Sequence, residues 1–193
     1  RSVIYLRNCH GRAIHPTEKP SALLEILIRT SCPEGGLVGD WFAGSGAAGE
    51  ACRLSGRSYL GCEIDADMAD LARARIAVQA RRTGVDALIL ALPQAQRDDA
   101  GLALDRFRWR VAAKQGDLAR ALMLERSTSA EALRDPAGWA ARRKDYARAA
   151  LRAGDWALAE RLAANHFLPA GVDAYELDWI AGYAALRAGA ADR

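Results

Sequence analysis

The chain has 193 residues, with 51% hydrophobic residues, 26% charged residues and a formal net charge of +3. This length suits one domain or two small ones, and the composition excludes a disordered or fibrous protein. No apolar run is long enough to span a bilayer. The chain opens on Arg1 rather than Met and shows no signal peptide, so we expect an N-terminal piece to precede it, and the missing signal says little about location.

Charge and cysteine differ between the two parts of the chain. Residues 1–80 hold nine basic and nine acidic side chains, whereas residues 81–193 hold eighteen and fifteen. Neither part is basic enough to predict nucleic-acid binding from charge alone. All four cysteines lie within the first 62 residues and none forms a C-x-x-C pair, so we expect reduced thiols rather than a metal site or a disulfide framework.

The first 80 residues predict alternating helices and strands. The apolar spacing, the glycines and the capping residues give five elements in chain order. The first four are a helix over 21–30 behind Pro20, a strand over 37–42, a helix over 47–54 ended by Gly56, and a strand over 58–64. The fifth element, a helix that Asp65 caps, follows the second strand. This order is typical of the first half of a nucleotide-binding α/β unit.

A glycine turn and a later acid carry the strongest chemical signal. Gly44 and Gly46 let the backbone turn sharply between strand and helix and approach a ligand closely. Glu63 follows Gly44 by 19 residues, at the predicted end of the next strand, where a carboxylate can accept both hydroxyls of a ribose. The pattern predicts a site for an adenosine-bearing cofactor. Gly49 lies three residues after Gly46, so NAD is not excluded by the glycines alone.

Three segments together resemble the DNA amino-methyltransferases that modify adenine N6 or cytosine N4, in the order of the beta-type members. Residues 15–20 (HPTEKP) resemble the segment that contacts the methionine end of S-adenosylmethionine, residues 40–46 resemble the cofactor loop, and residues 63–65 resemble the ribose-binding acid strand. The resemblance covers residues 1–78. It implies a partial Rossmann-like fold, S-adenosylmethionine as cofactor, DNA as partner and a cytoplasmic location.

The same resemblance implies the site residues. Thr17 and Lys19 would steady the methionine end, and Glu63 would hold the ribose. The full implied cofactor-binding set is Thr17, Lys19, Pro20, Asp40, Phe42, Ala43, Gly44, Ser45, Gly46, Glu63, Ile64 and Asp65.

The chain also departs from this family. Trp41 stands where members usually have Pro, and Ala47 and Ala48 stand where hydroxyl residues are usual. The family's base-holding motif, an Asp, Asn or Ser followed by Pro-Pro and an aromatic residue, precedes the segments seen here in beta-type members. No Pro-Pro occurs in the sequence. We therefore assign no catalytic residue, and we expect a cofactor-binding end, cut before residue 1 and inactive alone.

From about residue 66 onward the sequence predicts only helices. Three Ala-rich stretches align at 111–117, 149–155 and 184–190, and Gly116, Gly154 and Gly189 are each predicted to close a helix. A helix–turn–helix unit of this period predicts an α-solenoid of TPR-like helical repeats. The four tryptophans of this part are expected to pack between repeats, with glycan stacking as the alternative: Trp109, Trp139, Trp156 and Trp179.

Residues from about 71 to 193 resemble the superhelical region of soluble lytic murein transglycosylases, on the segments 105–110, 135–139 and 162–166. This resemblance implies a non-catalytic helical scaffold, with peptidoglycan as partner and the periplasm as location. The predicted architecture is therefore α/β followed by all-α, with domains at 1–78 and 79–193. Because the two families act in different compartments, we expect a chimera, which long-read sequencing of the locus would test.

Half of a parallel sheet makes a marginal core. A strand that is central in the family would expose a hydrogen-bonding edge and apolar faces without its neighbours. We therefore expect the first part to be less stable than the second, or to self-associate.

Overall fold

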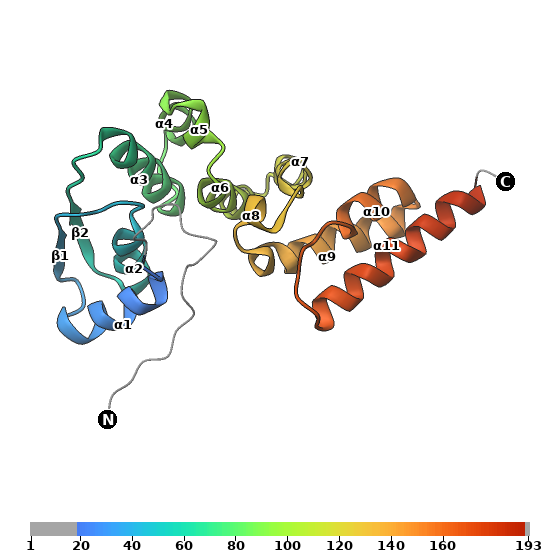
Figure 1. Ribbon diagram of the computed structural model, residues 1–193, viewed down its shortest axis with the longest axis horizontal. Coiled ribbons are helices and arrows are strands. Elements are labelled where there is room, and N and C mark those ends of the chain that lie inside the picture. Colours follow the sequence, from blue (N-terminus) through green and yellow to red (C-terminus); the bar gives the residue numbers. More distant parts are fainter. Residues whose placement is uncertain (1–18, 192–193) are drawn as a thin grey trace. The chain divides into compact units, whose positions relative to one another are not determined.

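The computed structural model describes residues 19–191, and the chain divides into two compact units, residues 1–105 and 106–193 (Figure 1). The division falls inside helix α6 (Ala100–Ala112). Asp105 belongs to the first unit because it pairs with Arg75 and Gln79 of that unit. The predicted boundary at 78/79 concerns where one sequence resemblance ends and the other begins, and it remains a prediction.

The first unit contains a two-stranded parallel sheet, and helices precede, separate and follow its two strands in the sequence. In order these are α1 (Ser21–Ser31), β1 (Leu37–Asp40), α2 (Ala47–Ser55), β2 (Ser58–Gly61), α3 (Ala66–Gln79), α4 (Val85–Ala91) and α5 (Gln94–Arg97). The register runs from Leu37 opposite Ser58 to Asp40 opposite Gly61. The predicted order of elements is confirmed. Both strands end earlier than predicted, at Asp40 rather than 42 and at Gly61 rather than 64.

Local signals fix the ends of these elements. Gly56 ends α2 with a φ of 72°, a conformation that glycine adopts without steric penalty. Asp65 lies just before α3, and its Oδ1 accepts hydrogen bonds from the backbone N–H of Asp67 (3.0 Å) and Met68 (3.1 Å). Both features match the sequence predictions, because each depends only on residues close in the chain.

A small apolar cluster joins α1, α2 and the sheet. Ile28, Ala51 and Cys52 are buried in it, with Val38 and Tyr59 packed alongside. Gly49 permits this packing, since a Cβ there would lie 2.8 Å from Ile76 Cδ1 and 3.2 Å from the Tyr59 ring. The helix between the two strands therefore lies close to both the sheet and α3.

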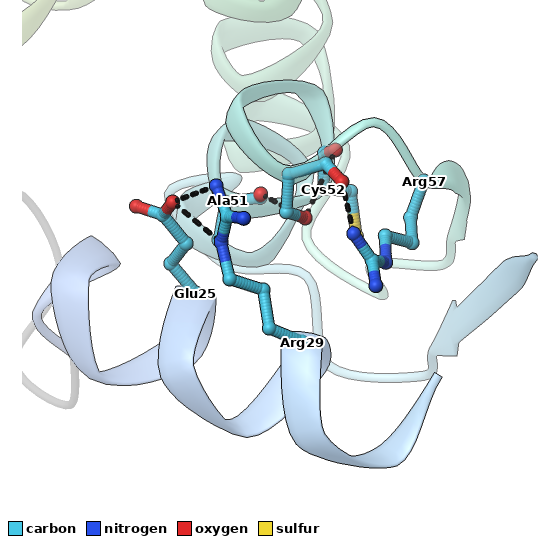
Figure 2. A network of polar contacts seen from close by, with 6 residues as sticks. Glu25, Arg29, Ala51, Cys52 and Arg57 are labelled. Carbon is cyan, nitrogen blue, oxygen red and sulfur yellow. Dashed lines mark hydrogen bonds and ion pairs between the residues drawn. The ribbon is translucent and has the colours of Figure 1, made fainter. Parts of the chain in front are cut away.

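Polar contacts border this cluster, as Figure 2 shows. Glu25 and Arg29 form an exposed ion pair of 2.7 Å on α1. Arg57 turns back towards the end of α2, where it donates to the carbonyl oxygen of Ser55. It also donates, at 2.9 Å, to the carbonyl oxygen of Cys32 at the end of α1. The loop before β1 is thereby tied to the loop before β2.

The sheet leaves apolar side chains in solvent. Leu37, Leu60, Trp41 and Phe42 are all exposed, Phe42 to 89%. Among the described residues each strand pairs only with the other, so each has an outer edge without a strand partner. The expectation of an exposed edge and exposed apolar faces is confirmed. Lower stability and self-association of this unit remain predictions.

The second unit is helical throughout its described residues. It contains the end of α6, then α7 (Gly116–Arg126), α8 (Ala130–Leu133), α9 (Pro136–Ala153), α10 (Trp156–Ala163) and α11 (Val172–Ala191). The helices α9, α10 and α11 pack against one another. Trp139 is fully buried, stacks on Phe107 with a ring-centre distance of 4.3 Å, and donates from Nε1 to the carbonyl of Leu133 at 3.0 Å.

Arg143 is a second fully buried side chain of this unit. It donates to the carbonyl oxygens of Leu162 (2.9 Å) and Ala164 (3.3 Å) at the end of α10, and to Ser127 Oγ (2.6 Å) after α7. Burial lowers the pKa of Arg143 to about 10. The side chain replaces the water that these helix-end carbonyls would otherwise need.

Two of the three glycine predictions are wrong. Gly154 does end α9, with a φ of 75°. Gly116 instead begins α7, because the positive φ that reverses the chain falls on Lys114, and Gly189 lies within α11. Trp179 is also not packed between helices but is 63% exposed, whereas Trp156 contacts Tyr183 edge to face. A regular solenoid therefore remains a prediction, although the helical class of this part is confirmed.

Between residues 19 and 191, every helix is either too short or too polar to cross a membrane. The same part of the chain contains no group of His, Cys, Asp or Glu residues suited to a metal ion.

Candidate functional site

The site lies where the two parallel strands end. Gly44 follows β1 and Glu63 follows β2, so the shared strand direction brings them together at one edge of the sheet. The backbone N–H of Gly44 donates to Glu63 Oε2 at 2.7 Å. Glu63 Oε1 accepts from the backbone N–H of Ile64 (2.9 Å) and Asp65 (3.1 Å). Three peptide groups therefore hold this carboxylate in one orientation.

The glycine turn is compact. Gly44 and Gly46 have φ values of 49° and 78°, in the region that favours glycine, and Gly46 N–H donates to the Ala43 carbonyl at 2.9 Å. A Cβ on Gly46 would also lie 3.3 Å from Ala72 Cβ of α3. The turn delivers the chain directly into the first turn of α2, whose N–H groups carry partial positive charge.

Asp40 is fixed at the end of β1. Its Oδ1 accepts from the backbone N–H of Phe42 (3.1 Å), and its Oδ2 accepts from the Tyr59 hydroxyl (3.2 Å). Burial raises the pKa of Tyr59 well above its ordinary value, and the neighbouring Asp40 charge adds to this shift. The phenol therefore stays protonated and keeps donating to the carboxylate.

A buried ion pair supports the turn from behind. Arg75 Nη1 donates to the Ser45 carbonyl at 3.1 Å, and Arg75 Nε donates to Asp105 Oδ2 at 2.8 Å. Both side chains are about 95% or more buried. Burial is the largest single effect on Arg75 and acts to lower its pKa, but the charges of Asp105, Asp99 and Glu50, with the hydrogen bond to Asp105, together outweigh it, and the net pKa is raised. Burial also raises the pKa of the Asp105 carboxyl. No motif in the sequence predicted this pair, because its members are thirty residues apart.

A pocket of about 540 Å³ lies in front of this arrangement, within the usual range for a small-molecule site. Seven of the predicted residues line it: Lys19, Asp40, Phe42, Ala43, Gly44, Ser45 and Glu63. Four predicted residues are not in the lining, namely Pro20, Gly46, Ile64 and Asp65. Gly46 and Asp65 instead precede α2 and α3 as their caps, and Ile64 is fully exposed. Thr17 and His15 lie outside the described residues.

The remaining lining residues were missed by the sequence analysis. They are Leu24, Leu27, Ile28 and Ser31 of α1, Val38 and Gly39 of β1, and Ala47 and Ala48 of α2. The apolar spacing of α1 was visible, but it marks a buried face without saying what that face covers.

The pocket combines two kinds of wall. Leu24, Leu27 and Ile28 make one side apolar, whereas Asp40 and Glu63 bring two carboxylates and Lys19 brings an ammonium group. Such a lining suits a ligand that has a flat apolar part, neighbouring hydroxyl groups and both signs of charge. The acceptor-only oxygens of Glu63 match hydroxyl donors in particular.

Comparison with known proteins places this site within a family segment. Residues 4–74 match the DNA methylase family (N6_N4_Mtase). The chain is 37% identical over 75 residues to the Type II methyltransferase M.ScaI of Streptomyces caespitosus, covering 39% of this chain and 25% of that protein. It is 40% identical over 66 residues to the Type II methyltransferase M.HpaI of Haemophilus parainfluenzae, covering 34% of this chain and 21% of that protein.

No solved structure matches the chain. The chain spans about a quarter or less of the length of these two curated relatives. The family match stops at residue 74, so the resemblance of residues 71–193 to murein transglycosylases, and the chimera that it implies, remain predictions. Residues 4–74 are thus a segment similar to DNA methyltransferases, and they include the glycine turn, Glu63 and all of the residues that line the pocket.

Proposed function

We propose that the first unit binds S-adenosylmethionine as the cofactor-binding part of a DNA amino-methyltransferase acting on adenine N6 or cytosine N4. The observation that carries this proposal is the 2.7 Å hydrogen bond between Gly44 N and Glu63 Oε2 at the pocket. It joins the glycine turn to the one carboxylate whose spacing suits a ribose.

The lining residues suit the parts of this cofactor. Glu63 would accept the ribose hydroxyls, the apolar α1 wall would cover the adenine, and Lys19, with Thr17, would meet the methionine carboxylate. Asp40 would offset the cationic end. The cofactor, when bound, supplies an activated methyl group. The chain's own contribution is to hold and orient it.

Calorimetric titration of S-adenosylmethionine tests this proposal. We expect binding to the wild type that weakens about tenfold or more in Glu63→Gln, because hydrogen bonds to a charged acceptor contribute about 1.5–3 kcal/mol. Asp70→Asn is the matched control, since Asp70 is exposed and pairs only across one turn with Arg73. Equal binding by Glu63→Gln, or tighter binding of NAD than of S-adenosylmethionine, would contradict the proposal.

DNA is the proposed partner of this segment, and the cytoplasm is the location that a DNA substrate implies. The 193 residues contain no Pro-Pro, so the base-holding motif of the family is missing from them. We therefore expect the chain by itself to transfer no methyl group to DNA. Turnover in an assay with tritiated S-adenosylmethionine would refute this expectation.

The second unit supports a different candidate, a non-catalytic helical scaffold that binds peptidoglycan in the periplasm. Its described residues form only helices and their connections, as such a platform requires. Co-sedimentation with purified sacculi tests it. Retention of the full chain, lost on competition with soluble glycan fragments, is the supporting result, and an unbound chain is the contrary one.

A further inference from the structure

The peptide group between Ser45 and Gly46 is held at both of its ends. Its carbonyl oxygen accepts a hydrogen bond from Arg75 Nη1 at 3.1 Å. Its N–H donates to the carbonyl oxygen of Ala43 at 2.9 Å. Because a peptide group is planar, these two hydrogen bonds together fix the orientation of this part of the glycine turn.

The peptide group between Ala43 and Gly44 continues the same line of hydrogen bonds. Its carbonyl oxygen is the acceptor for the Gly46 N–H, and its own N–H donates to Glu63 Oε2 at 2.7 Å. All of these bonds therefore donate in one direction, from the guanidinium of Arg75 to the carboxylate of Glu63. Hydrogen bonds aligned in this way polarise one another, and a cation at the donor end with an anion at the acceptor end adds to that effect.

Arg75 is itself held by contacts that leave it little freedom. Its Nε donates to Asp105 Oδ2 at 2.8 Å, and Gln79 Nε2 donates to the same oxygen at 3.0 Å. The side chains of Arg75 and Asp105 are only 5% and 3% exposed. Because Gly46 has no Cβ, which would lie 3.3 Å from Ala72 Cβ one turn before Arg75, α3 can approach the glycine turn closely. The guanidinium therefore reaches the turn from a fixed position.

We propose that Arg75, held by Asp105, is a positioning residue for the Glu63 carboxylate and acts through the two peptide groups of the glycine turn. The inference rests on the proposed function, in which Glu63 accepts the ribose hydroxyls of S-adenosylmethionine. Arg75 does not line the pocket. Its contribution is to keep the Gly44 N–H aimed at Glu63, so that the carboxylate keeps one orientation at the pocket. Arg75 and Asp105 both follow residue 74, where the family match ends, so residues outside the family segment contribute to ligand affinity.

The double variant Arg75→Met with Asp105→Leu tests this proposal without leaving a buried charge unpaired. Hydrogen exchange of the full chain without cofactor is followed by NMR. We expect the Gly44 and Gly46 amide protons to exchange at least about tenfold faster than in the wild type, because the turn has lost the donor that orients it. The Gly44 amide proton should also move upfield as its hydrogen bond lengthens.

Ile89→Val is the control for a general loss of stability. Ile89 is buried on α4 of the same unit and does not line the pocket, so this change lowers stability without touching the turn. Arg75→Lys is the second variant. It keeps a positive charge opposite Asp105, but an ammonium group lacks the planar fork of a guanidinium, so we expect a smaller change in the same direction. Wild-type exchange at both glycines in both Arg75 variants, or equal acceleration in Ile89→Val, overturns the proposal.

Calorimetric titration of S-adenosylmethionine completes the test. We expect the double variant to bind about threefold to tenfold more weakly than the wild type, because the Glu63 carboxylate is present but less well oriented. Wild-type affinity in the double variant and in Arg75→Lys overturns the proposal. A wild type that binds no S-adenosylmethionine refutes the proposed function instead, while the exchange rates of the two glycine amides still decide whether Arg75 positions the turn.

Discussion

The two units bury different kinds of side chain. In the first unit a carboxylate, a glycine turn and an arginine–aspartate pair are held by directional hydrogen bonds, while Phe42 and Leu60 stay in solvent. In the second unit most of the interior is aromatic and aliphatic, with Trp139 fully buried, and Arg143 is its buried charged side chain. Hydrogen bonds fix where a ligand-holding atom lies, whereas apolar packing supplies most of the folding energy. We therefore expect the first unit to be well defined at its pocket and yet easier to unfold.

The largest effect is expected for Trp139→Ala. Loss of this fully buried ring and of its stacking on Phe107 should cost about 3–5 kcal/mol of unfolding free energy. Denaturant unfolding followed by far-ultraviolet circular dichroism measures it. Leu118→Ala, on an exposed side chain of the same unit, should change stability by less than about 0.5 kcal/mol. Similar losses in both variants would show that the second unit does not depend on a packed interior.

A comparable test in the first unit is Arg75→Met. It leaves the Asp105 carboxylate buried without its partner and frees the Ser45 carbonyl, and should cost about 3 kcal/mol or slightly more. Among the described cysteines Cys52 is the buried one and it lies in the first unit, so the rate at which its thiol is labelled reports unfolding of this unit. The double variant Arg75→Met with Asp105→Leu should recover most of the loss. If it does not, the pair acts through the Ser45 carbonyl rather than through charge balance.

Asp65→Ala is expected to cause a smaller loss of unfolding free energy. Two backbone N–H groups at the start of α3 lose their acceptor, which should cost about 1 kcal/mol. Asp65→Asn should retain most of the stability, because an amide oxygen also caps helices well. The same thiol-labelling measurement resolves the difference. An equal loss in both variants would mean that charge, rather than the cap hydrogen bonds, stabilises this helix start.

The smallest effect is a pH dependence at Cys52. Burial raises the pKa of this thiol above its ordinary value of 9.0, and neighbouring Cys32 and Asp40 add to the shift. The stability that follows is present below pH 9 and is lost as the pH rises, because the unfolded thiol ionises before the folded one. The loss at pH 9 is at most about 0.4 kcal/mol, the value reached when half of the unfolded thiols and none of the folded ones are ionised. Cys52→Ala should abolish this component, and an unchanged slope between pH 8 and 10 in that variant would exclude it.

Local signals in the sequence predicted local structure well. Gly56 and Asp65 were placed correctly because each satisfies backbone groups within its own turn. The sequence also predicted that Glu63 lies near the glycine turn, since parallel strands bring equivalent ends together. The hydrogen bond between them was not predicted. These features needed no knowledge of contacts between distant residues.

Contacts set by packing were not predictable in this way. The α1 wall of the pocket and the link from Arg75 to Asp105 depend on how helices sit on the sheet, which no short motif encodes. The prediction that Gly116 and Gly189 close helices was wrong, because a glycine between Ala-rich stretches can equally begin or continue a helix. Lys114 has a positive φ of 60°, which a lysine does not favour and which no pattern in the sequence predicted.

The backbone hydrogen bonds to Glu63 have a consequence for the length of the glycine turn. Three of its contacts come from main-chain amides, which every residue type except proline supplies. A single-residue insertion or deletion between Asp40 and Gly46 would shift the Gly44 amide out of reach of the carboxylate. The length of this turn, together with glycine at positions 44 and 46, therefore determines where that hydrogen bond can form.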